Sequence, residues 1–209
     1  MTSIAATGEG RILRWGRLLL LGMIGAIVAF AWTGWGAAPP SREAFYNRDL
    51  WMRDGGWDDA DRDCQDTRAE VLVRDARPDT VRFRGQGHCV VASGVWEDPY
   101  TGAVVTDPAR LDVDHLVPLR WAHGRGGGIW PPDQKQAFAN DLGYRWHLVA
   151  ASRGANRQKG ARGPDRWRPP RREFRCQYAE AWAAVTTVWG LRVTGAEREA
   201  LRAMLAECR

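Results

Sequence analysis

The stretch Leu111-Asp112-Val113-Asp114-His115-Leu116-Val117-Pro118-Leu119 constrains the fold more than any other part of the chain. Apolar and polar residues alternate at its start, as in a half-buried β-strand, and Pro118 ends the strand because proline donates no ladder hydrogen bond. Successive strand residues point to opposite faces, so Asp112 and Asp114 share one face and His115 lies on the other. The strand end could still bring Asp114 and His115 to one cleft, which predicts a chemical site there.

Short strands and helices are predicted on both sides of this stretch. Residues 81–84 and 89–96 have the composition of strands, and a glycine-containing turn separates them. A further short strand is expected at 146–150. Together these elements predict an α+β fold with a small antiparallel sheet. Helical segments are expected at 64–72 and, after the Pro131-Pro132 pair, at 134–140, with a glycine-rich loop at 121–128.

The C-terminal region has the pattern of a helical hairpin. The first helix is predicted over residues 176–189 and is followed by Gly190, the residue that most often ends a helix. Thr194 and Glu197 have the spacing of a capping box, which predicts the start of a second helix that ends at residue 208.

The N-terminal segment, residues 1–38, is predicted to direct export. Three arginines within residues 11–17 precede an uncharged apolar run over residues 18–38. A membrane span needs roughly 17–25 residues, so this hydrophobic helix fits either a cleavable signal peptide or a membrane anchor. Both place the rest of the chain outside the cytoplasm by the positive-inside rule. Residues 39–63, with an acidic cluster that we interpret as a solvated turn, are expected to form a linker.

The four cysteines predict two disulfides, because their number is even and the chain is expected to be exported. Two antiparallel helices of about 20 Å, at about 1.5 Å per residue, would bring Cys176 and Cys208 together. Cys64 and Cys89 then form the second pair by elimination. Four cysteines allow three connectivities, so this pairing is a preference. A zinc site is the competing interpretation, although no closely spaced pair of cysteines is present.

Positive charge gathers around the central motif. Residues 111–175 carry 13 Lys and Arg against 6 acids, whereas residues 41–110 carry 10 Arg against 14 acids. A basic surface beside carboxylates fits a polyanionic substrate. A GC-rich genome is the alternative explanation for the arginine count, because 28 of the 30 basic residues are Arg. It explains the clustering less well.

A second polar segment, Asn156-Arg157-Gln158-Lys159-Gly160, lies later in the same basic region. Hydrolysis of a phosphodiester needs a base for water and a cation that neutralises charge on the phosphate. His115 takes up a proton near neutral pH, and Asp114 and Asn156 offer oxygen ligands of the kind that Mg²⁺ prefers. Arg157 and Lys159 would meet phosphate oxygens. The two polar segments together predict one phosphodiesterase site.

These segments occur in the order of the HNH endonuclease signature of the ββα-metal fold, and the chain resembles that family. Within the family it is similar to the exported bacterial HNH proteins related to the C-terminal domain of GmrSD-type restriction enzymes. The resemblance covers about residues 64–208, which implies an HNH nuclease domain at 64–209. The matching features are residues 112–118, His147-Leu148-Val149, residues 156–159, Cys64 with Thr67-Arg68, Gly94-Val95-Trp96, Phe138-Ala139-Asn140-Asp141, residues 167–170 and the cysteine-bounded helices.

The resemblance implies a role for each residue that matches the signature. His115 corresponds to the general base that activates water, and Asp114 and Asn156 correspond to the metal ligands. His147 falls at the middle position, which is usually Asn and braces the loop that carries the base. A histidine can also hydrogen-bond a backbone carbonyl, or it could become an extra metal ligand. Lys159 would contact phosphate near the site.

A divalent metal ion and a nucleic acid are the implied cofactor and partner. Mg²⁺ is the first choice, with Mn²⁺ and Zn²⁺ as alternatives. Asp112 would orient the groups around the metal, and Arg153, Arg157 and Arg162 would bind nucleic acid. The run from residue 162 to 175 reads equally as a nucleic-acid groove, with one stacking aromatic, or as a solvated loop.

We therefore predict an exported, metal-dependent HNH endonuclease that cuts DNA, or alternatively RNA, without strong sequence preference. The main alternative is a non-catalytic nucleic-acid-binding envelope protein on a degenerate HNH fold. A second alternative is a disulfide-stapled envelope protein that binds another protein. The membrane becomes a further partner if the N-terminal segment is retained, and the sequence assigns no oligomeric state.

Overall fold

The computed structural model describes residues 45–53 and 56–208. The predicted signal peptide or anchor at residues 1–38, with its hydrophobic helix, lies outside the described residues. Within the described ranges, no helix has both the length and the apolar character needed to cross a bilayer.

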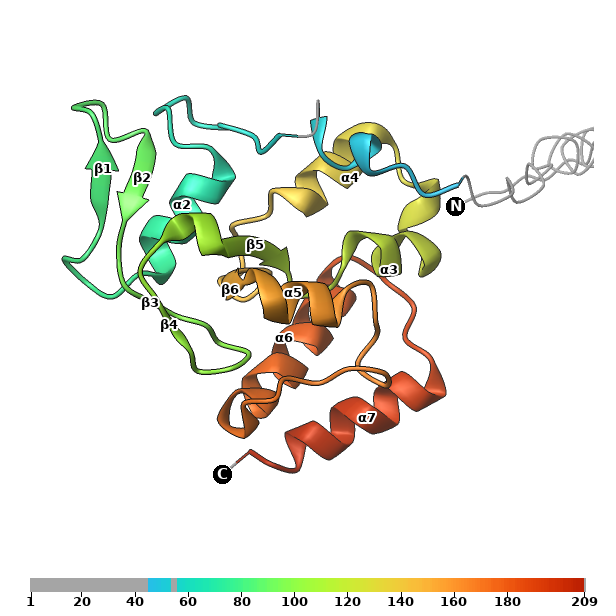
Figure 1. The fold of residues 1–209 in the computed structure, drawn as a ribbon. Helices are drawn as coiled ribbons and strands as arrows, with labels where there is room; N and C mark the ends of the chain where they lie inside the picture. The colour runs from blue at the N-terminus through green and yellow to red at the C-terminus, as the bar shows by residue number, and fades with distance from the viewer. Residues whose placement is uncertain (1–44, 54–55, 209) are drawn as a thin grey trace, which may run out of the picture. The chain divides into compact units, whose positions relative to one another are not determined.

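An antiparallel pair of strands lies at the centre of the domain and has a helix directly after it (Figure 1). We call this pair the central hairpin, although residues 116–147, which include two helices, connect its strands. Strand β5 (Leu111–His115) pairs antiparallel with β6 (Leu148–Ser152), in a register that runs from Leu111 opposite Ser152 to His115 opposite Leu148. Helix α5 (Arg153–Lys159) starts at the next residue, and the Ser152 hydroxyl caps its N-terminus by accepting a hydrogen bond from the Ala155 amide. The strand at 111–117 and the strand at 146–150 are therefore the two strands of one hairpin.

Both faces of β6 are buried, which explains its nearly continuous apolar sequence. Leu148 and Ala150 pack into a cluster with helix α2 (Thr67–Asp75). Val149 and Ala151, which point the other way, pack into a second cluster with helix α6 (Arg175–Val188). Asp112 and Asp114 lie on the same side of β5 as α5.

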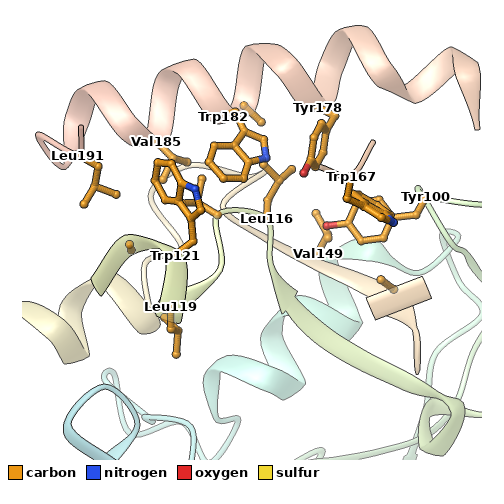
Figure 2. Packing of buried hydrophobic residues seen from close by; sticks show 14 of the residues in the cluster. Tyr100, Leu116, Leu119, Trp121, Val149, Trp167, Tyr178, Trp182, Val185 and Leu191 are labelled. Atoms are coloured by element: carbon orange, nitrogen blue, oxygen red, sulfur yellow. The ribbon is translucent and has the colours of Figure 1, made fainter. Parts of the chain in front are cut away.

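The predicted helical hairpin is formed by α6 and by α7 (Gly195–Leu205). Thr194 and Glu197 make both hydrogen bonds of the predicted capping box, and a Cys176–Cys208 disulfide joins the open ends of the two helices. On its inner side, α6 places Tyr178, Trp182 and Val185 against residues from several other segments of the domain (Figure 2). The largest aromatic cluster of the domain therefore fixes the C-terminal helices to the central hairpin. The residues that it meets include Tyr100, Leu116, Trp121, Val149 and Trp167.

The described strands form three separate two-stranded antiparallel sheets rather than one. The Cys64–Cys89 disulfide ties the start of the domain to the turn before β2. The two disulfides thus have the preferred connectivity. The two outer sheets pair β1 (Arg82–Arg84) with β2 (Val90–Ser93) and β3 (Trp96–Glu97) with β4 (Val104–Val105).

The segment expected to be a glycine-rich loop at 121–128 is mostly helical. Helix α3 (Leu119–Gly124) follows Pro118 directly, because its apolar residues have a core to pack against, and a 3-10 turn, η4 (Gly127–Ile129), comes next. The loop prediction was therefore wrong. Helix α4 (Pro132–Ala139) begins at a proline, as expected for a first-turn position.

The described part of the predicted linker belongs to the folded domain. A 3-10 turn, η1 (Arg48–Leu50), leads into Trp51 and Met52, which are both buried in the main core. Further on, the Asp58 amide donates to the Asn140 side chain at 3.0 Å. The linker prediction for residues 39–63 is corrected to this extent, because the apolar residues of the segment have partners that are distant in the sequence. Three acids of its acidic cluster accept hydrogen bonds from nearby amides, as a turn requires: Asp59 from Cys64, Asp61 from Asp63, and Asp63 from Gln65.

Candidate active site

The central hairpin and α5 bring the two polar segments of the sequence together. Because β5 alternates, Asp112 and Asp114 both contact residues of α5, which follows the partner strand. His115 points to the opposite face, toward the end of α4. The site therefore has an acid side, next to α5, and a histidine side, next to α4.

Asp112 lies at the solvent-accessible end of the acid side. The Asn156 side-chain amide donates to Asp112 Oδ2 at 3.1 Å, and Arg153 Nε lies 3.4 Å from the other carboxylate oxygen. The Asp112 side chain remains 33% exposed. The Asp112 carboxylate and the Asn156 amide therefore form a pair of adjacent oxygen-bearing groups that water can reach.

Asp114 lies two residues further along the same face but is buried. The Tyr100 hydroxyl donates to its Oδ2 at 2.6 Å, and the Lys159 ammonium lies 2.8 Å from Oδ2 and 3.0 Å from Oδ1. Lys159 also donates to the main-chain carbonyl of His115 at 2.8 Å, and its side chain is 0% exposed. Burial raises the pKa of Asp114 and lowers the pKa of Lys159, and the ion pair opposes both shifts. This buried pair ties α5 to β5.

His115 is held in one orientation on the histidine side. Its Nε2 lies 2.8 Å from the carbonyl oxygen of Ala139, and the ring of Trp57 stacks on the imidazole with 5.4 Å between centroids. The side chain is mostly buried, at 5% exposure. Burial, and then the neighbouring His147, hold the pKa of His115 well below its usual value, so the imidazole is neutral at physiological pH. If Nε2 carries the proton that Ala139 accepts, Nδ1 keeps its lone pair.

His147, like His115, contacts the C-terminal end of α4. Its Nε2 lies 2.6 Å from the carbonyl oxygen of Phe138, and its own carbonyl accepts a hydrogen bond from the Leu116 amide at 2.9 Å. The ring is fully buried, and burial lowers its pKa. The contact with Phe138 is a hydrogen bond to a backbone carbonyl, the kind of contact that bracing requires.

The predicted nucleic-acid-binding residues all lie on the surface, whereas Lys159 does not. Arg153 and Arg157 lie on the outer side of α5, and Arg162 is exposed just after it. Lys159 is directed into the protein by Asp114, so its ammonium is not placed to meet a phosphate on the surface. The expected stacking aromatic of this region, Trp167, packs against Tyr100 and Tyr178 and is only 9% exposed, too little for a base to stack on.

Two residues of the site were missed from the sequence. Tyr100 belongs to a segment that reads as a turn, and nothing local indicates that its hydroxyl reaches Asp114. Trp57 belongs to the segment interpreted as a linker. The signal that could have identified Trp57 is its size, because a tryptophan in a polar segment usually has a packing partner.

Comparison with known proteins identifies the family. Residues 66–204 match the family described as GmrSD restriction endonucleases, C-terminal domain, and the chain belongs to this family. It is also similar to an uncharacterized secreted protein of Arthroderma benhamiae, with 40% identity over 142 residues, 68% of this chain and 67% of that protein. No solved structure matches the chain.

Membership of a restriction-endonuclease family indicates a nuclease, which is a hydrolase acting on nucleic acid. It also indicates use of a divalent metal ion. Asp112 and Asn156 fit such a group, because both offer hard oxygen donors and Mg²⁺ usually keeps several waters beside one or two protein ligands. Rotation of the Asn156 amide would turn its oxygen, in place of the Nδ2 donor, toward Asp112.

Proposed function

We propose that the chain is a metal-dependent HNH endonuclease that hydrolyses phosphodiester bonds of DNA, with RNA as the alternative substrate. The order β5–β6–α5 is that of a ββα-metal core, with the acid side and the histidine side on a single unit. One observation carries the proposal: the partly exposed Asp112–Asn156 pair and the neutral His115 come from this one unit, on opposite faces of β5.

We assign the cation to Asp112 and Asn156. The sequence favours Asp114 as the ligand and Asp112 as a supporting residue. Asp114, however, is buried and accepts hydrogen bonds from the buried Lys159 and Tyr100, whereas Asp112 is 33% exposed and its partners lie at the surface. A bound divalent ion would neutralise charge on the phosphate oxygens. Arg153 and Arg157, on the outer side of the same helix, would hold the neighbouring phosphates by charge-assisted hydrogen bonds.

His115 acts as the general base in this proposal. Its Nδ1 accepts a proton from water as the water oxygen bonds to phosphorus. The bond from phosphorus to the leaving sugar oxygen breaks, and that oxygen takes a proton from solvent. The low pKa of His115 keeps the base unprotonated at neutral pH. Ala139 and Trp57 hold the ring in place, and Lys159 fixes the main chain behind it.

The proposed place of action is outside the cytoplasm. Two disulfides cross-link the described domain, and disulfides persist mainly in oxidising compartments. The Arthroderma relative is described as secreted. The apolar segment at residues 18–38 is consistent with export, by cleavage or as an anchor.

The test is cleavage of supercoiled plasmid by the purified, oxidised full-length chain, with Mg²⁺, Mn²⁺ or Zn²⁺ and with chelator. We expect metal-dependent nicking, and a loss of about 10²–10⁴-fold in His115→Ala, the usual contribution of a general base. His88→Ala is the matched control, because His88 is exposed in the turn before β2. Equal activity in His115→Ala and the parent chain would remove His115 from the base role.

The depth of His115 favours one alternative, a non-catalytic nucleic-acid-binding protein. A base that is 5% exposed and stacked under Trp57 has little room for an attacking water. Metal-independent DNA binding that weakens steeply with salt, without cleavage under any metal, would support this alternative.

A further inference from the structure

The loop that follows α5 holds a row of arginines on the surface. Residues 160–171 contain no regular helix or strand beyond turns, yet buried and exposed residues alternate along them. The buried residues anchor the loop, so the arginines between them are directed outward. The anchors are Gly163, Pro164, Trp167 and Pro169, and the exposed arginines are Arg162, Arg166 and Arg168.

The loop is fixed against α7 by close backbone packing. A Cβ atom on Gly163 would lie 2.8 Å from Glu197 Oε1, so a larger residue would displace a buried carboxylate that Trp121 and Arg125 hold by hydrogen bonds. The Gly163 carbonyl accepts hydrogen bonds from the amides of Arg166 at 3.0 Å and Trp167 at 3.1 Å. The arginines are therefore presented by a rigid loop, which lowers the entropy that a ligand would lose on ordering them.

Two surface grooves meet at this loop. One lies between the loop and α7 and is lined by Arg166, Arg168 and Met204, among others. The other lies between the loop and α3 and is lined by Arg120 and again by Arg166. Arg162 lines both grooves and comes shortly after Arg157 of α5. The basic surface thus continues from α5 across the loop.

Few acids offset this charge. Asp165 lies 3.6 Å from Arg166, and this ion pair is exposed and therefore weak. Glu197 is buried, and its carboxylate accepts hydrogen bonds from Arg125 at 2.7 Å and from the Trp121 indole at 2.8 Å. The outward charge of the two grooves is positive, which suits a ligand with regularly spaced anionic groups.

We propose that Arg120, Arg162, Arg166 and Arg168, the arginine track, bind the sugar–phosphate backbone of duplex DNA. The proposal rests on the proposed function, because the bound backbone would lead toward the Asp112–Asn156 site. Guanidinium groups pair with phosphates in two-pronged hydrogen bonds without reading sequence. Proteins that bind single strands add aromatic faces for stacking, but both tryptophans that line the grooves, Trp121 and Trp167, are buried. The track therefore favours the duplex.

The test measures binding rather than cleavage, so it succeeds or fails independently of the nuclease proposal. The full-length chain carrying His115→Ala is titrated, with chelator present, into a labelled duplex and into the matching single strand, at several salt concentrations. Arg166→Gln/Arg168→Gln is compared with Arg82→Gln/Arg84→Gln, which removes the same charge from β1, on another side of the domain (Figure 1).

We expect the track double variant to weaken duplex binding about ten-fold or more near physiological salt. The slope of log affinity against log salt should fall in magnitude by about 2, close to one for each arginine that no longer pairs with a phosphate. The control pair should change the slope by much less. If the slope falls equally in the track variant and in the control variant, only the net charge of the protein matters, and the proposal is overturned. Tighter binding of the single strand, or binding of polyglutamate with none of DNA, would overturn the proposal.

Discussion

Asp112 and Asp114 are the same residue type on the same face of the same strand, and both pair with α5, yet their surroundings differ. Asp112 is one-third exposed and contacts Asn156 and Arg153. Asp114 is buried and contacts Lys159 and Tyr100. Both carboxylates have partners, so it is burial that separates the one that water and ions can reach from the one enclosed in the protein.

This difference determines what each acid can do. A buried carboxylate paired with a buried ammonium contributes little net stability, but removing one partner leaves an uncompensated charge in the protein. A partly exposed carboxylate, whose partners are a neutral amide and a surface arginine, can exchange those contacts for a cation. We therefore expect Asp114 to matter first for folding and Asp112 first for metal binding, and the following variants test that division.

Lys159→Met should have the largest effect. It leaves Asp114 buried without its cation and should lower the free energy of unfolding by about 3–5 kcal/mol. The double variant Asp114→Asn/Lys159→Met should recover a large part of this loss, because Asp114→Asn removes the carboxylate charge that Lys159→Met leaves unpaired. Urea unfolding followed by tryptophan fluorescence measures both. A loss below about 1 kcal/mol in the single variant would mean that the pair is not a structural tie.

Asp112→Asn should weaken metal binding at least ten-fold, because one of the two proposed ligands loses its charge. The free energy of unfolding should change by less than about 1 kcal/mol, since the side chain is partly exposed. Calorimetric titration with Mn²⁺ measures the affinity without relying on cleavage. If Asp114→Asn instead shows the larger loss of affinity in a stably folded protein, the ligand role returns to Asp114.

The buried His115 and His147 make the stability of the domain depend on pH. The folded-state pKa of His147 lies below its ordinary value of 6.5, so the unfolded chain takes up the proton first as pH falls. The stability that the neutral His147 contributes is therefore fully present above about pH 6.5. Below that pH the free energy of unfolding falls by at most about 1.4 kcal/mol per pH unit for this one group. His147→Asn, which should keep the contact with Phe138, should flatten the fall in stability between about pH 6.5 and 5. His88→Asn should leave the slope unchanged, and an unchanged slope in His147→Asn would contradict the prediction.

Local signals in the sequence were enough to predict the framework around these residues. The alternation in residues 111–117, the capping box at Thr194 and the cysteines at the ends of the C-terminal helices each depend on neighbours along the chain. The structure has a strand, a capped helix and a disulfide at these places. The segment at 156–159 was likewise placed correctly after a strand, at α5.

Interactions between distant segments could not be predicted in the same way. Nothing near Asp114 in the sequence indicates that Tyr100 and Lys159 will enclose it. Strand alternation places Asp112 and Asp114 on the same face and does not distinguish their burial. Trp51 and Trp57 lie in a segment with polar and acidic neighbours, so its composition reads as a linker although the core supplies their partners. Burial depth is a property of the assembled domain, so the sequence could not indicate that Asp112, rather than Asp114, is the acid that water can reach.

Arg153→Gln should have the smallest effect on folding. The Arg153–Asp112 ion pair joins two partly exposed side chains, and such pairs contribute at most about 1 kcal/mol. We expect a change in the free energy of unfolding of less than about 0.5 kcal/mol, together with a two- to three-fold decrease in DNA affinity if Arg153 binds phosphate. Urea unfolding and salt-dependent DNA binding measure the two effects on the same sample. A decrease in stability comparable to that of Lys159→Met would mean that the exposed end of β5 is as tightly coupled to α5 as the buried end, and the contrast between Asp112 and Asp114 would no longer hold.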